Sequence, residues 1–154
     1  MKPDLRPARE QDREFLFLLY SSTRADEIAA LGWPAAQQQA FLRMQFNAQQ
    51  RWYETAFAGA EHQIIESGSQ PIGRIVVLRE QGSWHLIDIS LLPAYRAQGM
   101  GGELLRDLIR DCKQAGANLK LQVLNTNPAR RLYERLGFIS TGQDQIYTQM
   151  ELRS

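Results

Sequence analysis

The 154-residue sequence has little that would tie it to a disulfide, a metal or a membrane. It contains one cysteine, Cys112, and two histidines, so it cannot form an intramolecular disulfide, and we expect no metal site. No apolar run approaches the ~20 residues that span a bilayer, and residues 1–6 show no apolar signal core. We therefore expect a cytoplasmic protein with no membrane partner, in which Cys112 is a reduced core thiol.

The sequence also has no large charge excess. Its formal net charge of +1 gives no overall attraction to nucleic acid, so no nucleic-acid partner is expected, and an anionic ligand would have to be attracted locally. With 44% hydrophobic and 23% charged residues, the composition is that of an ordinary globular protein. The length suits a single domain over residues 1–154.

Two common phosphate-binding motifs are missing. No Walker sequence is present, and Leu104 stands where a dinucleotide fingerprint needs its third glycine. Three glycines nevertheless fall within four positions at 99–102, after an apolar run at 86–92 and before a helical apolar stripe at positions 104, 105, 108, 109 and 112. This pattern predicts a strand that turns tightly into a helix, whose first amides lack carbonyl partners and suit a phosphate-like anion.

Around this turn the chain alternates strands and helices. We expect strands at 5–8, 62–66, 72–78, 84–92, 119–124, 138–140 and 145–152 and helices at 15–20, 24–31, 35–57, 103–112 and 129–136. Ser21-Ser22-Thr23 is expected to weaken the first helix, and the third should have Phe41, Met44 and Trp52 on one side. Short turns favour antiparallel neighbours between 62 and 92, whereas the helix at 103–112 predicts a parallel crossover to 119–124.

Two motifs in this framework resemble one family. Arg96-x-x-Gly99-x-Gly101 resembles the acetyl-CoA pyrophosphate loop of the GNAT superfamily of N-acetyltransferases. Ala129, Tyr133, Gly137 and Phe138 match the spacing of the family's second motif, in the usual order and at the usual separation. The likeness is good from about position 62 to the C-terminus and looser before it.

The resemblance implies a fold of the α/β class (α+β type). This would be a single GNAT-like domain, with a mixed, mostly antiparallel sheet of about six or seven strands flanked by helices and one parallel pair around the cofactor loop. The function implied is direct transfer of an acetyl group from acetyl-CoA, as cosubstrate, to a primary amine of a small molecule or peptide. The alternative is a catalytically inactive acyl-CoA-binding sensor or interaction module with the same fold. A homodimer is compatible with either, and the sequence does not name the acceptor.

The resemblance also assigns cofactor-binding residues. The diphosphate would lie on the loop amides of Ala97, Gln98, Gly99, Met100, Gly101 and Gly102. Arg96 would add positive charge nearby, and Asn127 would contact the cofactor arm, although it is also placed to cap a helix. The pantetheine chain would pair with the backbone of Ile89, Leu91 and Leu92.

By the same resemblance, Tyr133 would face the cofactor sulfur. A phenol with a pKa near 10 can donate to a thiolate whose thiol has a pKa of about 8.5, although Tyr133 could instead simply fill the core. As the base that deprotonates the amine we rank His85 first, Glu27 second and Asp88 third, with Asp88 expected to face away from His85 on the same strand. Each has a plain structural alternative: a solvated strand histidine, a charged helix face and a structural carboxylate.

Overall fold

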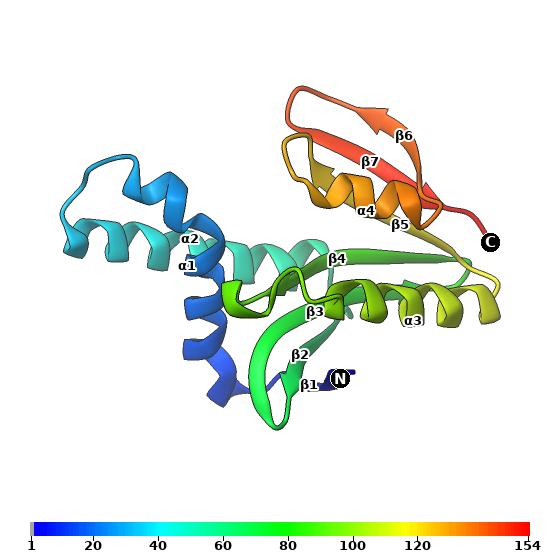
Figure 1. The fold of residues 1–154 in the computed structure, drawn as a ribbon, viewed down its shortest axis with the longest axis horizontal. Helices are drawn as coiled ribbons and strands as arrows, with labels where there is room; N and C mark the ends of the chain where they lie inside the picture. Colours follow the sequence, from blue (N-terminus) through cyan, green and yellow to red (C-terminus); the bar gives the residue numbers. More distant parts are fainter. Residues whose placement is uncertain (1) are drawn as a thin grey trace.

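A seven-stranded sheet runs through the protein, with helices against both faces (Figure 1). The computed structural model describes residues 2–154. The strand order is β1-β2-β3-β4-β5-β7-β6, and only β4 and β5 run parallel. The mixed sheet, the single parallel pair and the flanking helices are those predicted. Within residues 2–154, no helix is both long and apolar enough to cross a membrane.

The elements follow the expected order with small shifts at their ends. The strands are β1 (Asp4–Pro7), β2 (Glu61–Ser67), β3 (Gln70–Glu80), β4 (Ser83–Leu91), β5 (Asn118–Leu124), β6 (Ile139–Gln143) and β7 (Tyr147–Leu152). The α-helices are α1 (Arg13–Ala29), α2 (Ala35–Ala56), α3 (Met100–Gln114) and α4 (Ala129–Arg135). Short 3₁₀ turns lie at Glu10–Asp12 and Pro93–Tyr95.

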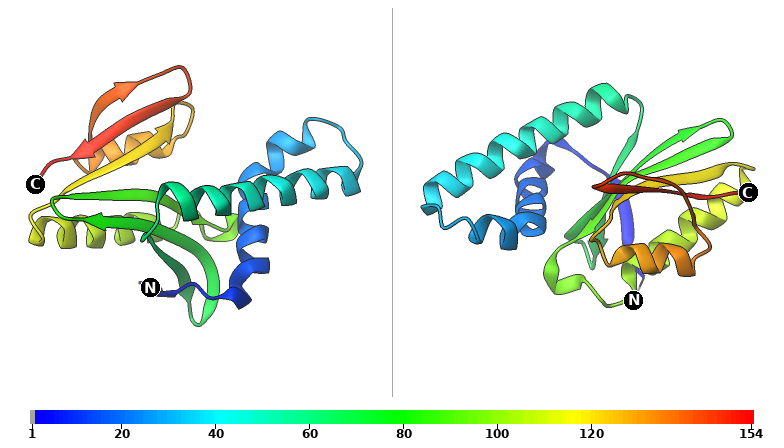
Figure 2. Two further views of the ribbon diagram at one scale, coloured as in Figure 1. Left: turned by 180° about the vertical axis from the view of Figure 1, so that it is seen from behind. Right: turned by 90° about the horizontal axis from the view of Figure 1, so that it is seen from above.

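The helices divide into two layers that cover opposite faces of the sheet. Figure 2 shows α1 and α2 on one side and α3 and α4 on the other. The predicted apolar stripe of α3 is confirmed, because it is buried against the sheet through Leu104, Leu105, Leu108, Ile109 and Cys112. On the opposite face, α1 and α2 bury Leu16, Leu19, Leu42 and Phe46 against Ile64 of β2.

The predicted break in the first helix is wrong, since α1 is one continuous helix from Arg13 to Ala29. The Ser22 hydroxyl donates to the Leu19 carbonyl at 2.6 Å, and the Thr23 hydroxyl donates to the Tyr20 carbonyl at 2.7 Å. These polar side chains bond back to the preceding turn, so they do not interrupt the helix.

The prediction of which side of α2 is apolar is also wrong in part. The helix buries Leu42, Phe46 and Tyr53, whereas Met44 and Trp52 are more than half exposed. Each helical residue is turned by about 100° from the one before, so Met44 lies on nearly the opposite side of the helix from Leu42. The row through 42, 46 and 53 is the one that faces the sheet.

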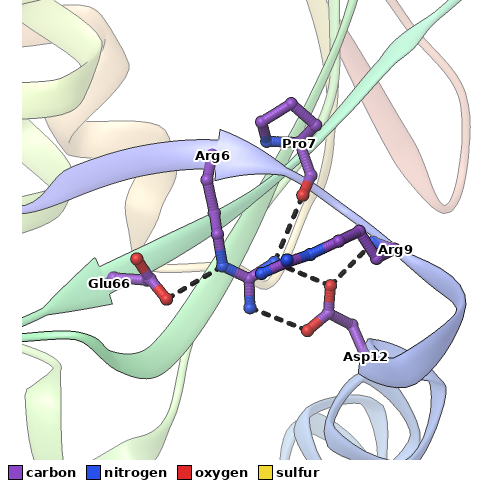
Figure 3. Close-up of polar contacts among 5 residues, drawn as sticks. All are labelled: Arg6, Pro7, Arg9, Asp12 and Glu66. Carbon is purple, nitrogen blue, oxygen red and sulfur yellow. Dashed lines mark hydrogen bonds and ion pairs between the residues drawn. The ribbon is translucent and has the colours of Figure 1, made fainter.

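A compact ion-pair cluster ties β1 to the start of α1 and to β2 (Figure 3). Arg6 donates through Nη1 and Nη2 to both carboxylate oxygens of buried Asp12, each at 2.8 Å, and through Nε to Glu66 at 2.9 Å. The backbone amide of Arg9 also donates to Asp12 at 2.7 Å. The hydrogen bonds from Arg6 hold the pKa of Asp12 below its usual range, although burial opposes the shift.

This cluster predicts that stability depends on Asp12 being ionised. Because its pKa is lowered in the folded state, its contribution is present above about pH 4 and is lost as the pH falls toward the folded pKa. Asp12→Asn should lower the free energy of unfolding at pH 7 by about 2 kcal/mol and flatten its dependence on pH between about 5 and 2. Urea unfolding over that pH range measures both effects. Asp4→Asn, at an exposed position on β1, the strand that carries Arg6, should change neither, and an equal effect of the two substitutions would contradict the prediction.

Candidate active site

The parallel pairing of β4 with β5 covers only the first part of β4. It runs from Ser83 opposite Asn118 to Leu86 opposite Leu121, whereas β4 itself continues to Leu91. A bulge at Ile87 coincides with this end, because Val77 of β3 pairs with Leu86 while the next residue along, Val76, pairs with Asp88. Beyond the bulge β4 follows β3, and Figure 1 shows β5 and β7 diverging from it. One edge of β4 therefore faces a gap in the sheet.

The backbone groups that face this gap can be identified from the pairing with β3. The Leu92 amide donates to the Ile72 carbonyl at 2.7 Å, so the bonded positions on the β3 side are 92, 90 and 88. The polar groups of Ile89 and Leu91 consequently point toward the gap, as a strand-like ligand would require. Leu92 does not fit its expected role, since its amide is bonded to β3 and its carbonyl accepts from the Tyr95 amide at 2.9 Å.

The glycine-bearing loop leads from the end of β4 into α3. Within residues 2–154, none of the consecutive amides from Ala97 to Gly102 donates a hydrogen bond; the first to do so is that of Glu103, to the Gly99 carbonyl at 3.0 Å. These amides lie at the positive end of the α3 dipole. The arrangement forms a backbone site for an anion.

The loop's backbone conformation turns its amides outward. Gly99 caps α3 with φ +81°, and Ala97 also has a positive φ, of 61°, which is rare for a residue with a side chain. Successive residues that alternate between right-handed and left-handed backbone conformations form a concave nest of N–H groups. A Cβ at Gly101 would have the Leu91 side chain 4.0 Å away as its nearest neighbour, so this glycine leaves open space over the amides rather than filling a packing need. The residues present thus fit a diphosphate.

Two arginines flank the loop, and only one was expected. Arg96 turns away from the amides, because its Nε donates to the Leu91 carbonyl at 2.9 Å and its Nη2 lies 3.5 Å from Ser22 Oγ on α1. Sequence reasoning missed Arg106, whose Nη1 would lie 3.3 Å from a Cβ on Gly102. The sequence does contain an indication of this contact. Arg106 follows Gly102 by one helical turn, and a glycine has no side chain that would keep the guanidinium away.

Tyr133 of α4 lies in the core on the α3 side of the sheet. It is 7% exposed and packs edge-on against Phe138, with ring centroids 5.7 Å apart. Burial raises the pKa of its phenol to about 12, with a further contribution from the negative charge of Asp88 on β4. Among residues 2–154 none hydrogen-bonds the phenol, so its proton is not used within the protein.

Asn127 is held by a bond to the first residue of α4. Its side-chain oxygen accepts from the Ala129 amide at 2.9 Å, although the N-cap residue of the helix is Pro128 and not Asn127 as predicted. This oxygen is therefore bonded within the protein. The side-chain nitrogen is the part left for a ligand.

The candidate bases lie on the α1–α2 side. His85 of β4 packs edge-on against Phe57, and it lines a cavity of about 220 Å³ with Lys120 and Glu151. Its pKa is lowered by burial and then by the charge of Lys120, so the imidazole is neutral at pH 7. Glu27 is on α1, where its exposed carboxylate pairs with Arg24 Nε at 3.0 Å.

Asp88 shares a face with His85, so the expectation that they face opposite ways is wrong. Asp88 contacts Arg74, which also holds two glutamines of α2, and His85 contacts Phe57 at the end of α2. The bulge at Ile87 adds one residue between them and reverses the alternation of side chains.

Comparisons with known proteins agree with this geometry. A family model described as an acetyltransferase (GNAT) domain matches residues 24–152. Among curated proteins, the ribosomal protein bS18-alanine N-acetyltransferase of Haemophilus influenzae is 44% identical over 54 residues, which are 34% of this chain. The match spans only 37% of that relative's length.

Solved structures share the fold at low sequence identity. The PaiA N-acetyltransferase of Thermoplasma acidophilum, in complex with coenzyme A, superposes with a TM-score of 0.74 at 19% identity over 100% of both chains. A GNAT family acetyltransferase of Elizabethkingia anophelis, with acetyl-CoA bound, gives 0.59 at 17% identity, covering 68% of this chain and 82% of that one. At these identities the likeness concerns the fold.

The surroundings of His85 predict how its titration responds to a neighbouring charge. Lys120→Gln removes the positive charge that disfavours the imidazolium, so the pKa of His85 should rise. It should remain below the ordinary 6.5, because burial is the larger cause of the shift. NMR titration of the imidazole protons measures this, with Lys113→Gln on the exposed side of α3 as the control. A pKa of His85 that is unchanged by Lys120→Gln would contradict the assignment.

Proposed function

Since the chain belongs to the GNAT family of acetyltransferases, we propose that it transfers an acetyl group directly from acetyl-CoA to a primary amine of a small molecule or peptide. The observation that carries the proposal is the run of unbonded amides from Ala97 to Gly102 beside a strand edge that has lost its neighbour. One element offers donors for a diphosphate, and the next offers strand-like pairing for an amide-containing chain. Pantetheine diphosphate has both chemistries in that order.

Cosubstrate binding is assigned to backbone more than to side chains. We propose that the loop amides hold the diphosphate, with Arg106 beside them, while Ile89 and Leu91 pair with the pantetheine amides. Because Arg96 Nε already donates to the Leu91 carbonyl, the amide is the group of Leu91 that is left for the pantetheine chain. Asn127 would reach the cofactor arm with its side-chain nitrogen, because its oxygen accepts from the Ala129 amide.

Acetyl-CoA supplies an activated thioester, and the residues around the gap manage its protons. As the amine nitrogen bonds to the acetyl carbon and the carbon–sulfur bond breaks, the sulfur becomes negative and the amine must lose a proton. Tyr133 donates a hydrogen bond to that sulfur. Because the phenol pKa of about 12 exceeds the ordinary thiol value of about 8.5, the phenol keeps its proton and stabilises the negative sulfur through this bond, and the thiolate leaves as such.

His85 is the proposed base for the amine proton, with Glu27 as the second candidate. His85 suits the task because its lowered pKa keeps it unprotonated at neutral pH. An acyl-enzyme route has no evident nucleophile, since buried Cys112 donates to the Ala117 carbonyl at 3.2 Å and its pKa is raised by burial. Transfer is therefore direct. We place the reaction in the cytoplasm, in keeping with this single reduced thiol.

The experiment that tests the function combines acetyl-CoA with a panel of amines and follows release of free thiol. The panel includes alkyl amines, diamines, amino acids and peptides beginning with alanine, the residue named for the Haemophilus influenzae relative. Thiol release that depends on one class of amine supports the enzyme. Binding of acetyl-CoA without turnover of any amine would favour the sensor alternative, and failure to bind it would overturn both.

Replacing the Tyr133 phenol predicts a loss of rate without a loss of binding. Tyr133→Phe keeps the ring packed against Phe138 but removes the donor, so kcat should fall by about 100-fold while the KM values stay within about twofold. Steady-state thiol release with the best amine measures this. Tyr147→Phe, which removes an exposed phenol from β7, is the matched control. Equal rates for Tyr133→Phe and the wild type would remove Tyr133 from the mechanism.

A further inference from the structure

Arg74 of β3 is a buried cation with an unusually full set of partners. It is 4% exposed, and its Nε donates to Asp88 Oδ2 at 2.8 Å. Its Nη1 donates to Gln50 at 3.0 Å and its Nη2 to Gln49 at 2.7 Å, both on α2. The guanidinium also lies over the ring of Tyr53, 5.2 Å from its centroid. Every arm of the guanidinium is therefore fixed, and so is the carboxylate oxygen that it holds.

Asp88 presents its other oxygen outward. Oδ2 is bound by Arg74, whereas Oδ1 accepts no hydrogen bond from residues 2–154, and the side chain is 23% exposed. Asp88 directly follows the bulge and precedes Ile89, whose polar groups face the gap. Its charge also raises the pKa of Tyr133, which lies on the opposite face of the sheet. Asp88 thus lies next to the open edge of β4 and within electrostatic range of Tyr133.

Stability alone gives little reason for this arrangement. The free energy needed to remove two charges from water is about as large as the free energy gained from their attraction in the interior. Apolar side chains of the same volume therefore often give a protein that is equally stable. The surrounding strand positions on this face include buried apolar residues such as Ile64 and Val76. A buried arginine that orients a partly exposed carboxylate instead produces a fixed dipole, with its negative end at the reaction gap.

We propose that Asp88 Oδ1 accepts an N–H hydrogen bond from the acceptor amine, and that Arg74 is the positioning residue that aims the carboxylate. The inference rests on the proposed acetyl transfer and adds the residue that holds its acceptor. The amine then reaches the gap from the α1–α2 face, where Asp88 and His85 lie, and the thioester from the face of α3 and Tyr133. The acceptor needs one N–H group to donate to Asp88 and another that is lost during acetylation. Primary amines are therefore favoured over tertiary ones.

The test separates acceptor binding from cosubstrate binding. With the best amine of the panel, Asp88→Asn should raise the amine KM at least about tenfold, the effect of losing a hydrogen bond to a charged group, while the dissociation constant for coenzyme A stays within twofold. Asp88→Glu keeps the charge and should restore part of the amine affinity. Arg74→Lys should raise the amine KM with little change in kcat. Asp107→Asn, a paired carboxylate of similar exposure on α3, is the control and should leave every constant unchanged.

The outcomes distinguish this inference from the function on which it rests. If the wild type binds coenzyme A and acetylates amines, but Asp88→Asn leaves the amine KM unchanged, the role of Asp88 is overturned and the acetyltransferase stands. If the wild type acetylates no amine, the proposed function fails first and the inference fails with it. Should Asp88→Asn unfold, Arg74→Lys and Asp88→Glu give the same comparison in folded protein, judged by thermal melting.

Discussion

The candidate site depends on one constraint in the sheet: β4 stays paired with β3 throughout but leaves β5 after Leu86. Backbone N–H and C=O groups are nearly always bonded inside proteins, so a strand edge that loses its neighbour next to the core must be met by solvent or by a ligand. The bulge at Ile87 marks where the two sets of pairing separate. The gap, the outward groups of Ile89 and the access between the two faces all follow from that separation.

The gap also explains how groups from different layers could act on one reaction. The loop before α3, together with Tyr133 on α4, belongs to one side of the sheet. Asp88 and His85 point toward α2 on the other side. In a continuous sheet these groups would be separated by a layer of strands. The Asp88 charge raises the pKa of the Tyr133 phenol, so these groups on opposite faces lie within electrostatic range of each other.

Much of this framework could be predicted because it depends on residues that are close together in the sequence. The stripe of α3 and the closely spaced glycines at 99–102 are short-range patterns, and they correctly gave a strand, a turn and a helix. The parallel partner of β4 followed from the length of the crossover. Local reasoning failed at α1, where the hydroxyls of Ser22 and Thr23 found partners within the helix. It failed again at α2, where packing against the sheet chose a different face.

The features that sequence reasoning missed depend on distant pairing. The bulge at Ile87 requires two neighbouring strands in different registers, so alternation alone placed Asp88 on the wrong face. Arg74 and Asp88 are 14 residues apart, and Gln49 and Gln50 come from a separate helix. The Arg106 guanidinium lies beside Gly102, 3.3 Å from where a Cβ would be. Each of these contacts depends on the assembled fold.

The central claim is that backbone amides at the loop and at the open edge of β4 hold coenzyme A. Amide chemical shifts measured by NMR during titration with coenzyme A test it residue by residue. The account predicts the largest changes at the amides of residues 97–102, Ile89 and Leu91, with smaller ones near Tyr133. Changes centred instead on the separate cavity of about 450 Å³ lined by Arg9, Arg13, Glu54 and His62, with the loop amides unmoved, would contradict it.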